Sequence, residues 1–80
     1  MNELKTVLAS YLNNSITMNE LEEWIVTNLQ KIIDTGDKKL NEIVDSIDAD
    51  LVEVGEGILS EEDLRGAVQE YFNILNKNRK

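Results

Sequence analysis

The run from Ile16 to Ile33 constrains the fold more than any other stretch, because it holds both a helix start signal and a long apolar face. Thr17 and Glu20 have the spacing of a capping box, in which each side chain accepts a hydrogen bond from the other residue's backbone N–H. Ile16 and Leu21 flank this box at the spacing of a hydrophobic staple. We therefore expect a helix that begins directly after Thr17.

The apolar face of this predicted helix is broad. Its apolar residues recur at helical spacing and then spread beyond one stripe: Leu21, Ile25, Leu29 and Ile32, widened by Trp24, Val26 and Ile33. Such a width predicts contact with at least two other helices, which would make this the central helix of a small bundle. Gly36 is suited to the left-handed conformation that ends many helices.

Three further helices are predicted by the same criteria. The first ends at Asn13-Asn14, because asparagine tolerates the left-handed region. Asp37 can cap the third, and Ser60 with Asp63 has capping-box spacing before the fourth. Each has one apolar stripe: Leu4, Val7, Leu8, Tyr11 and Leu12 in the first; Leu40, Ile43, Val44, Ile47, Leu51 and Val54 in the third; Leu64, Val68, Tyr71, Phe72 and Leu75 in the fourth. Ile58-Leu59 is expected to carry the chain back toward the core.

These elements predict an all-α fold, a single small antiparallel four-helix bundle. It would span residues 1–80 as one domain, with helices at about 2–12, 18–34, 38–54 and 61–76. Eighty residues suit one small domain, and the absence of proline removes the commonest helix breaker. A hydrophobic content of 41% is too high for a disordered chain.

The sequence predicts no enzyme activity, metal or cofactor. With no histidine and no cysteine, the usual general base and the strongest nucleophile are both missing. Ser60 is better explained as a helix cap than as a nucleophile. Asp45, Asp48 and Asp50 lack the histidine, cysteine or rigid loop of a tight metal site. The two capping segments also resemble the end of an EF-hand calcium loop, but Ala9, Tyr11, Val52 and Val54 occupy the first two side-chain ligand positions.

Acidic residues are concentrated in one part of the chain. The net charge is −8, and the segment 34–63 holds eleven acids against Lys38 and Lys39. A basic protein surface would be attracted to such a region, whereas direct binding to nucleic acid calls for the opposite charge. The predicted partner-binding residues lie on the back of the third helix and at the start of the fourth: Glu42, Asp45, Asp48, Val52, Glu53, Glu56, Glu61 and Glu62. The alternative is a well-solvated acidic surface without a partner.

Three single residues have two interpretations each. Val52 points away from the stripe of its helix and is either an interface anchor or an ordinary exposed apolar residue. Trp24, at the edge of its stripe, belongs to the core or to an interface, and its spacing favours the core. Gly66 lies inside the fourth helix, where it permits a close helix approach or a partner contact.

No part of the sequence resembles a membrane span or a secretory signal. The chain also has no cysteine, and therefore no disulfide framework. We expect a cytoplasmic protein that does not associate with membranes.

The phrase Y-L-N-N-S-I-T-M-N-E-L-E-E-W, in a short acidic helical chain, resembles the small bacterial immunity proteins that neutralise colicin-type toxins. The resemblance covers the first third of the chain and depends on Tyr11, Leu12, Ile16, Thr17, Glu20, Leu21 and Trp24. It implies an inhibitor that docks on a basic toxin or nuclease. The paired tyrosines that the nuclease inhibitors of this group have on their third helix are missing here, because the third helix has no aromatic residue.

Two other functions fit the same sequence. A phage-type DNA mimic would block a nucleic-acid-binding protein through acids spaced like phosphates over a continuous surface. A structural homo-oligomer would instead associate through Trp24 and Val52. An immunity-type inhibitor needs an apolar anchor inside the acidic patch, and this distinguishes it from a DNA mimic. The chain is expected to be a monomer or homodimer, and its mass in solution would reveal a structural homo-oligomer.

Overall fold

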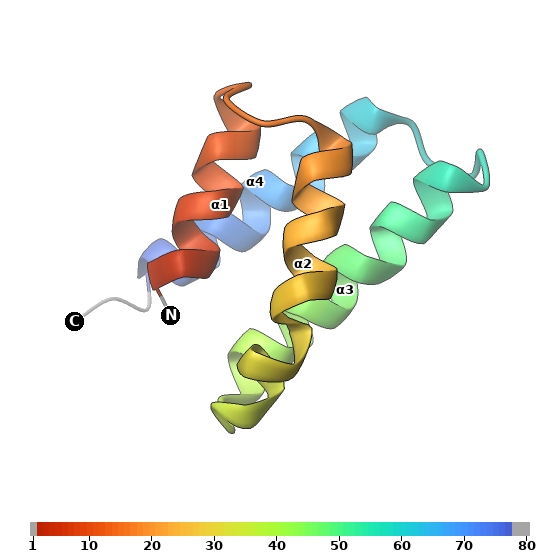
Figure 1. Cartoon of the computed structure of the whole chain (residues 1–80). Coiled ribbons are helices and arrows are strands. Elements are labelled where there is room, and N and C mark those ends of the chain that lie inside the picture. Colours follow the sequence, from red (N-terminus) through yellow and green to blue (C-terminus); the bar gives the residue numbers. More distant parts are fainter. Residues whose placement is uncertain (1, 78–80) are drawn as a thin grey trace.

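The computed structural model describes residues 2–77, and in that range it contains four helices and no strand (Figure 1). They are α1 (Asn2–Leu12), α2 (Met18–Asp34), α3 (Lys38–Gly55) and α4 (Glu61–Lys77). The predicted all-α class is confirmed. The predicted ends of the helices also agree, with α3 and α4 each extending one residue further than expected.

The capping residues define where the helices begin. Thr17 is extended (φ −87°, ψ 170°), and the capping box is complete. The Glu20 N–H donates to Thr17 Oγ1 (3.1 Å), and the Thr17 N–H donates to Glu20 Oε1 (2.8 Å). Asp37 Oδ1 accepts from the N–H groups of Lys39 and Leu40 at the start of α3. Each predicted cap is therefore present, because capping depends on neighbours only two or three residues away.

The turns that end the helices use the left-handed conformation. Asn14 has φ +68°, Gly36 has φ +72° and Gly57 has φ +80°. Ser60 and Asp63 form the second capping box before α4, with the Asp63 N–H donating to Ser60 Oγ (3.1 Å) and a longer return bond of 3.4 Å. The longer bond follows from the aspartate side chain, which is one methylene shorter than glutamate.

The four helices form a ring in which each helix packs against two others. The packed pairs are α1/α2, α2/α3, α3/α4 and α1/α4, whereas the diagonal pairs do not approach closely. Successive helices run in opposing directions, and α4 passes obliquely behind α1 and α2 (Figure 1). The helix α2 does contact two neighbours, as predicted, but it is no more central than the other three.

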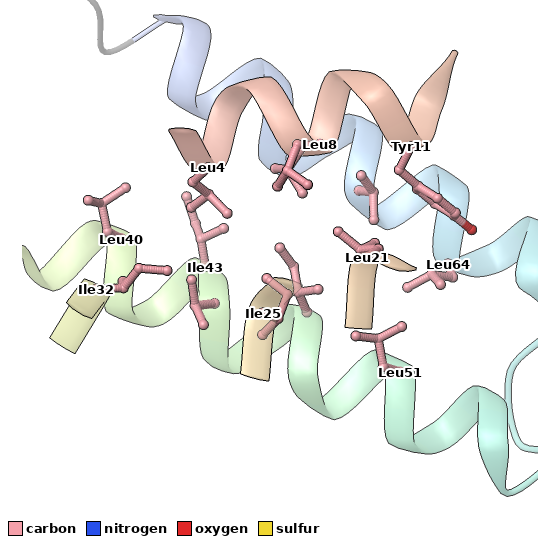
Figure 2. Close-up of a cluster of buried hydrophobic side chains, with 14 residues drawn as sticks. Leu4, Leu8, Tyr11, Leu21, Ile25, Ile32, Leu40, Ile43, Leu51 and Leu64 are labelled. Carbon is pink, nitrogen blue, oxygen red and sulfur yellow. The ribbon is translucent and has the colours of Figure 1, made fainter. Parts of the chain in front are cut away.

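The core is the interior of this ring. Figure 2 shows Leu4, Leu8 and Tyr11 of α1 directed into the same interior as Ile43 and other apolar side chains of α2, α3 and α4. The core contains fourteen buried hydrophobic residues and no buried polar one among the described residues. Full burial of one such aliphatic side chain contributes roughly 1.5–3 kcal/mol.

The width predicted for the apolar face of α2 is wrong. Val26 is 64% exposed and Ile33 is 47% exposed, so neither belongs to the core. The helix α2 packs against α1 and α3 only, and Val26 lies on the side of α2 that neither of them covers. Trp24 is partly buried and packs against the core from its edge. Ile58, predicted to carry the chain back toward the core together with Leu59, is also exposed, and Leu59 is only partly buried.

Candidate functional site

The side of α3 that points away from the core brings together five of the eight predicted site residues. The buried side holds Leu40, Ile43, Val44, Ile47 and Leu51. The opposite side holds exposed residues at intervals of three, four and seven positions, which place side chains along one side of a helix. We call these residues the α3 face: Glu42, Asp45, Asp48, Val52 and Glu56.

Val52 is the apolar centre of the α3 face. Its side chain is 50% exposed. Asp48 lies one turn before it and Glu56 one turn after it, at a Cβ separation of roughly 5–6 Å for such positions. The Glu56 N–H donates to the Val52 carbonyl (3.0 Å), which keeps the helical turn intact up to Glu56. The α3 face is therefore an exposed apolar side chain between carboxylates.

The carboxylates of the α3 face have no partner within residues 2–77. The two ion pairs in that range are Lys31–Glu3 (3.1 Å) and Arg65–Glu61 (3.9 Å), and both lie on other helices. Within the described residues, no side-chain hydrogen bond reaches the carboxylates of Glu42, Asp45, Asp48 and Glu56. Asp50, which is not part of the α3 face, accepts a hydrogen bond from Tyr71. These four negative charges face solvent.

The charges within α3 oppose the helix dipole, and only the N-cap Asp37, just before the helix, complements it. A helix favours acids in its first turn and bases in its last turn. The first turn of α3 has no acid but contains Lys38 and Lys39, and its last turn has no base but contains Glu53. In contrast, α4 starts with Glu61, Glu62 and Asp63 and ends with Lys77, as the dipole favours. Local helix stability explains the acids of α4 and does not explain those of α3.

The remaining three predicted site residues lie elsewhere. Glu53 is partly buried at the edge of the α3 face. Glu62 is exposed but belongs to the first turn of α4, beyond the connecting loop. Glu61 is directed toward α1, where its Oε2 accepts a hydrogen bond from the Tyr11 hydroxyl (3.0 Å). Glu61 therefore joins two helices: its side chain is 49% exposed but already accepts a hydrogen bond from Tyr11.

Sequence reasoning missed the cluster that surrounds this contact. The Arg65 guanidinium lies 4.5 Å from the centre of the Tyr11 ring. Its Nη1 donates to the Tyr11 carbonyl (3.1 Å) and its Nη2 to Asn14 Oδ1 (2.6 Å). Burial of Tyr11, and then its hydrogen bond to Glu61, raises the pKa of Tyr11 to about 12. No local pattern could have revealed this cluster, because each contact between its two halves, one from α1 and its following turn and one from α4, joins residues at least fifty positions apart.

A second tyrosine joins α3 to α4. The Tyr71 hydroxyl donates to Asp50 Oδ2 (3.0 Å), and burial followed by this hydrogen bond raises the pKa of Tyr71. Asp50 therefore points away from Asp45 and Asp48, as helical spacing predicts. Within residues 2–77, no group of three or more potential ligand residues is placed to hold a metal ion.

Comparison of the chain with family models, with curated proteins and with solved structures finds no match. The resemblance to immunity proteins therefore depends on the residues named above alone. None of the four helices, over the residues that the structure describes, combines the length and the apolar character needed to cross a membrane.

Proposed function

We propose that this chain is a non-enzymatic protein-binding module of the cytoplasm, whose α3 face docks on a basic surface of another protein. An immunity or inhibitor protein would act in this way. The observation that carries the proposal is the position of Val52, half exposed between Asp48 and Glu56.

An anchored interface has a recognisable arrangement. A few apolar or aromatic side chains at its centre supply most of the binding energy, and surrounding charges select and orient the partner. The α3 face has both parts. Its carboxylates have no partner within residues 2–77, so a cationic partner would find them available.

The helix dipole of α3 gives a second argument for a binding role of the acids on this helix. Glu53 and Glu56 lie at the end of α3 where a negative charge costs about 0.3–1 kcal/mol of helix stability. Such a loss of helix stability is explained if the charge contributes to binding a partner.

The test uses the tagged protein as bait in lysate of its host cell, at low and then moderate salt, beside an Asp45→Lys/Glu53→Lys variant, which reverses one charge of the α3 face and one at its edge. Any retained protein is then purified and its affinity measured directly. We expect one basic partner that binds the wild type and loses at least about tenfold in affinity with the variant, which corresponds to about 1.4 kcal/mol. The matched control is Glu22→Lys/Glu70→Lys, which makes the same change in net charge at exposed positions of α2 and α4. Equal loss with the control would contradict a role for the α3 face.

A Val52→Ser variant distinguishes an anchored interface from a DNA mimic. It leaves every charge in place and alters only the apolar centre. An anchored interface loses binding on this change, whereas a surface of phosphate-like charges keeps it.

A further inference from the structure

A second surface, formed by α1 and α2, contains the only tryptophan of the chain. Two adjoining hollows of about 360 and 340 Å³ lie there, and both are lined by Val7, Ile16 and Trp24. Neither includes a residue of α3. We call the two hollows together the Trp24 groove.

The groove follows the two helices. On α1 its lining extends from Glu3 to Ser10, and on α2 it extends from Glu20 to Asn28. At 1.5 Å per residue these stretches are about 10 and 12 Å long. The groove therefore has the length of about two turns of a helix laid beside α1 and α2, a mode of recognition in which an amphipathic helix places its apolar side in a groove.

The rim of the groove is acidic. Glu3, Glu20 and Glu23 line it, and none of its lining residues is a cation. Lys31 pairs with Glu3 from outside the groove (3.1 Å). Glu20 uses one oxygen for the cap of α2, whereas Glu23 is exposed and has no side-chain partner within the described residues. A second copy of this chain, with a net charge of −8, would bring further acids to this rim.

We infer that the Trp24 groove binds a basic amphipathic helix of a partner protein, which places an apolar side chain beside Trp24 and lysine or arginine beside Glu23. This site is additional to the α3 face. It gives the molecule two acidic surfaces, each with an apolar centre, on different helices.

The test uses the intrinsic fluorescence of Trp24, which is the only tryptophan and so reports on the groove alone. The probe is a synthetic peptide of about twelve residues, or about three turns, with leucines at helical spacing and lysines elsewhere. One control peptide has glutamate in place of lysine, and the other has the same composition with the leucines scattered around the helix. We expect a saturable shift of Trp24 emission to shorter wavelength with the first peptide alone.

Two variants test whether the peptide binds in the Trp24 groove. Thr6→Phe fills the groove from an exposed position, and Glu23→Lys reverses a charge at its rim. We expect each to weaken the peptide affinity by about tenfold, equivalent to about 1.4 kcal/mol. The Asp45→Lys/Glu53→Lys variant, which alters the α3 face and its edge, should leave the emission shift in place, so failure of one surface is distinguishable from failure of the other.

Several results would overturn the inference. They are the absence of a shift, an equal shift with either control peptide, and loss of the shift in the α3 variant but not in Glu23→Lys. A shift produced by concentrating the protein alone, with a doubled mass in solution, would identify a second copy as the occupant instead.

Discussion

Tyr11 and Glu61 are separated by fifty residues, yet the hydroxyl of one donates to the carboxylate of the other over 3.0 Å. This contact joins α1 to α4, the one packed pair of helices that is not consecutive in the chain. Arg65 lies against both residues, and the aromatic ring of Tyr11 is fully buried. The contact therefore links the first of the four described helices to the last.

Removal of this hydroxyl should destabilise the protein without unfolding it. We expect Tyr11→Phe to lower the free energy of unfolding by about 1.5–3 kcal/mol, the usual net value of a hydrogen bond to a charged group. For a domain of this size the melting temperature should fall by about 4–8 °C for each kcal/mol that is lost. Thermal unfolding followed by circular dichroism measures this change. The control is the same change in a Glu61→Ala background, where Tyr11→Phe should cost little because the acceptor is gone; an equal cost in both backgrounds would contradict the contact.

The same contact predicts a loss of stability at alkaline pH. The folded protein holds the Tyr11 proton more tightly than the unfolded chain, because the pKa is about 12 in the fold against 10 when unperturbed. The contribution is therefore complete below pH 10 and disappears as the pH rises to 12. Tyr71, whose pKa is also raised, acts in the same direction. Urea unfolding over this range should show a steeper decline for wild type than for Tyr11→Phe, and parallel curves would refute the assignment.

Gly66 should tolerate alanine. A Cβ added there meets no atom within 4 Å, so the glycine does not serve a close approach between helices of this chain. We expect Gly66→Ala to stabilise the protein by about 1 kcal/mol, since glycine is the poorer helix former by that amount. Gly57, at φ +80°, is the matched control, because alanine there should cost about 1–2 kcal/mol. Chemical denaturation compares the two. A destabilised Gly66→Ala would be inconsistent with the open space at that position.

Neighbouring residues of α2 should respond very differently to truncation. Ile25 is 1% exposed, whereas Val26 is 64% exposed. We expect Ile25→Ala to cost about 2–5 kcal/mol, through lost burial and the cavity left behind. Val26→Ala should change stability by less than about 0.5 kcal/mol. Equilibrium unfolding in urea measures both, and similar costs would place Val26 in the core after all.

Reversal of the acids at the end of α3 should raise stability. Glu53→Lys places a favourable charge near the C-terminus of the helix, and we expect a gain of about 0.3–1 kcal/mol at low salt. The matched control is Glu62→Lys in the first turn of α4, where the same change opposes the dipole and should destabilise. Thermal melts at low and high salt test both, because the effect of each charge should weaken as salt is added.

The elements of this fold could be predicted because their signals are local. Thr17, Asp37 and Ser60 each cap a helix through neighbours at most three residues away, so the sequence contains the whole interaction. The apolar stripes of α1 and α3 were likewise predictable, since each faces the single interior of the ring. For α2 the stripe was overestimated, because apolar composition alone does not tell which side a neighbouring helix covers.

The candidate site was only partly predictable for the same reason. Helical spacing places Asp45, Asp48 and Val52 on one side of α3, and the structure agrees. Helical spacing could not show that Glu61 contacts Tyr11 and Arg65, because the contact with Tyr11 requires α1 and α4 to pack together. The groove beside Trp24 could not be predicted from the sequence either, because it exists only where two helices pack together.

The ring arrangement of the helices also has a consequence for the order of folding. The contacts of α1 with α2, of α2 with α3 and of α3 with α4 each close a short stretch of chain, whereas α1 and α4 meet only by enclosing almost the whole molecule. Closing the longer stretch costs more chain entropy. We therefore expect the three consecutive pairs of helices to associate first, as an open arc with exposed apolar sides. The meeting of α1 and α4 would then be the late step that converts this arc into the native protein.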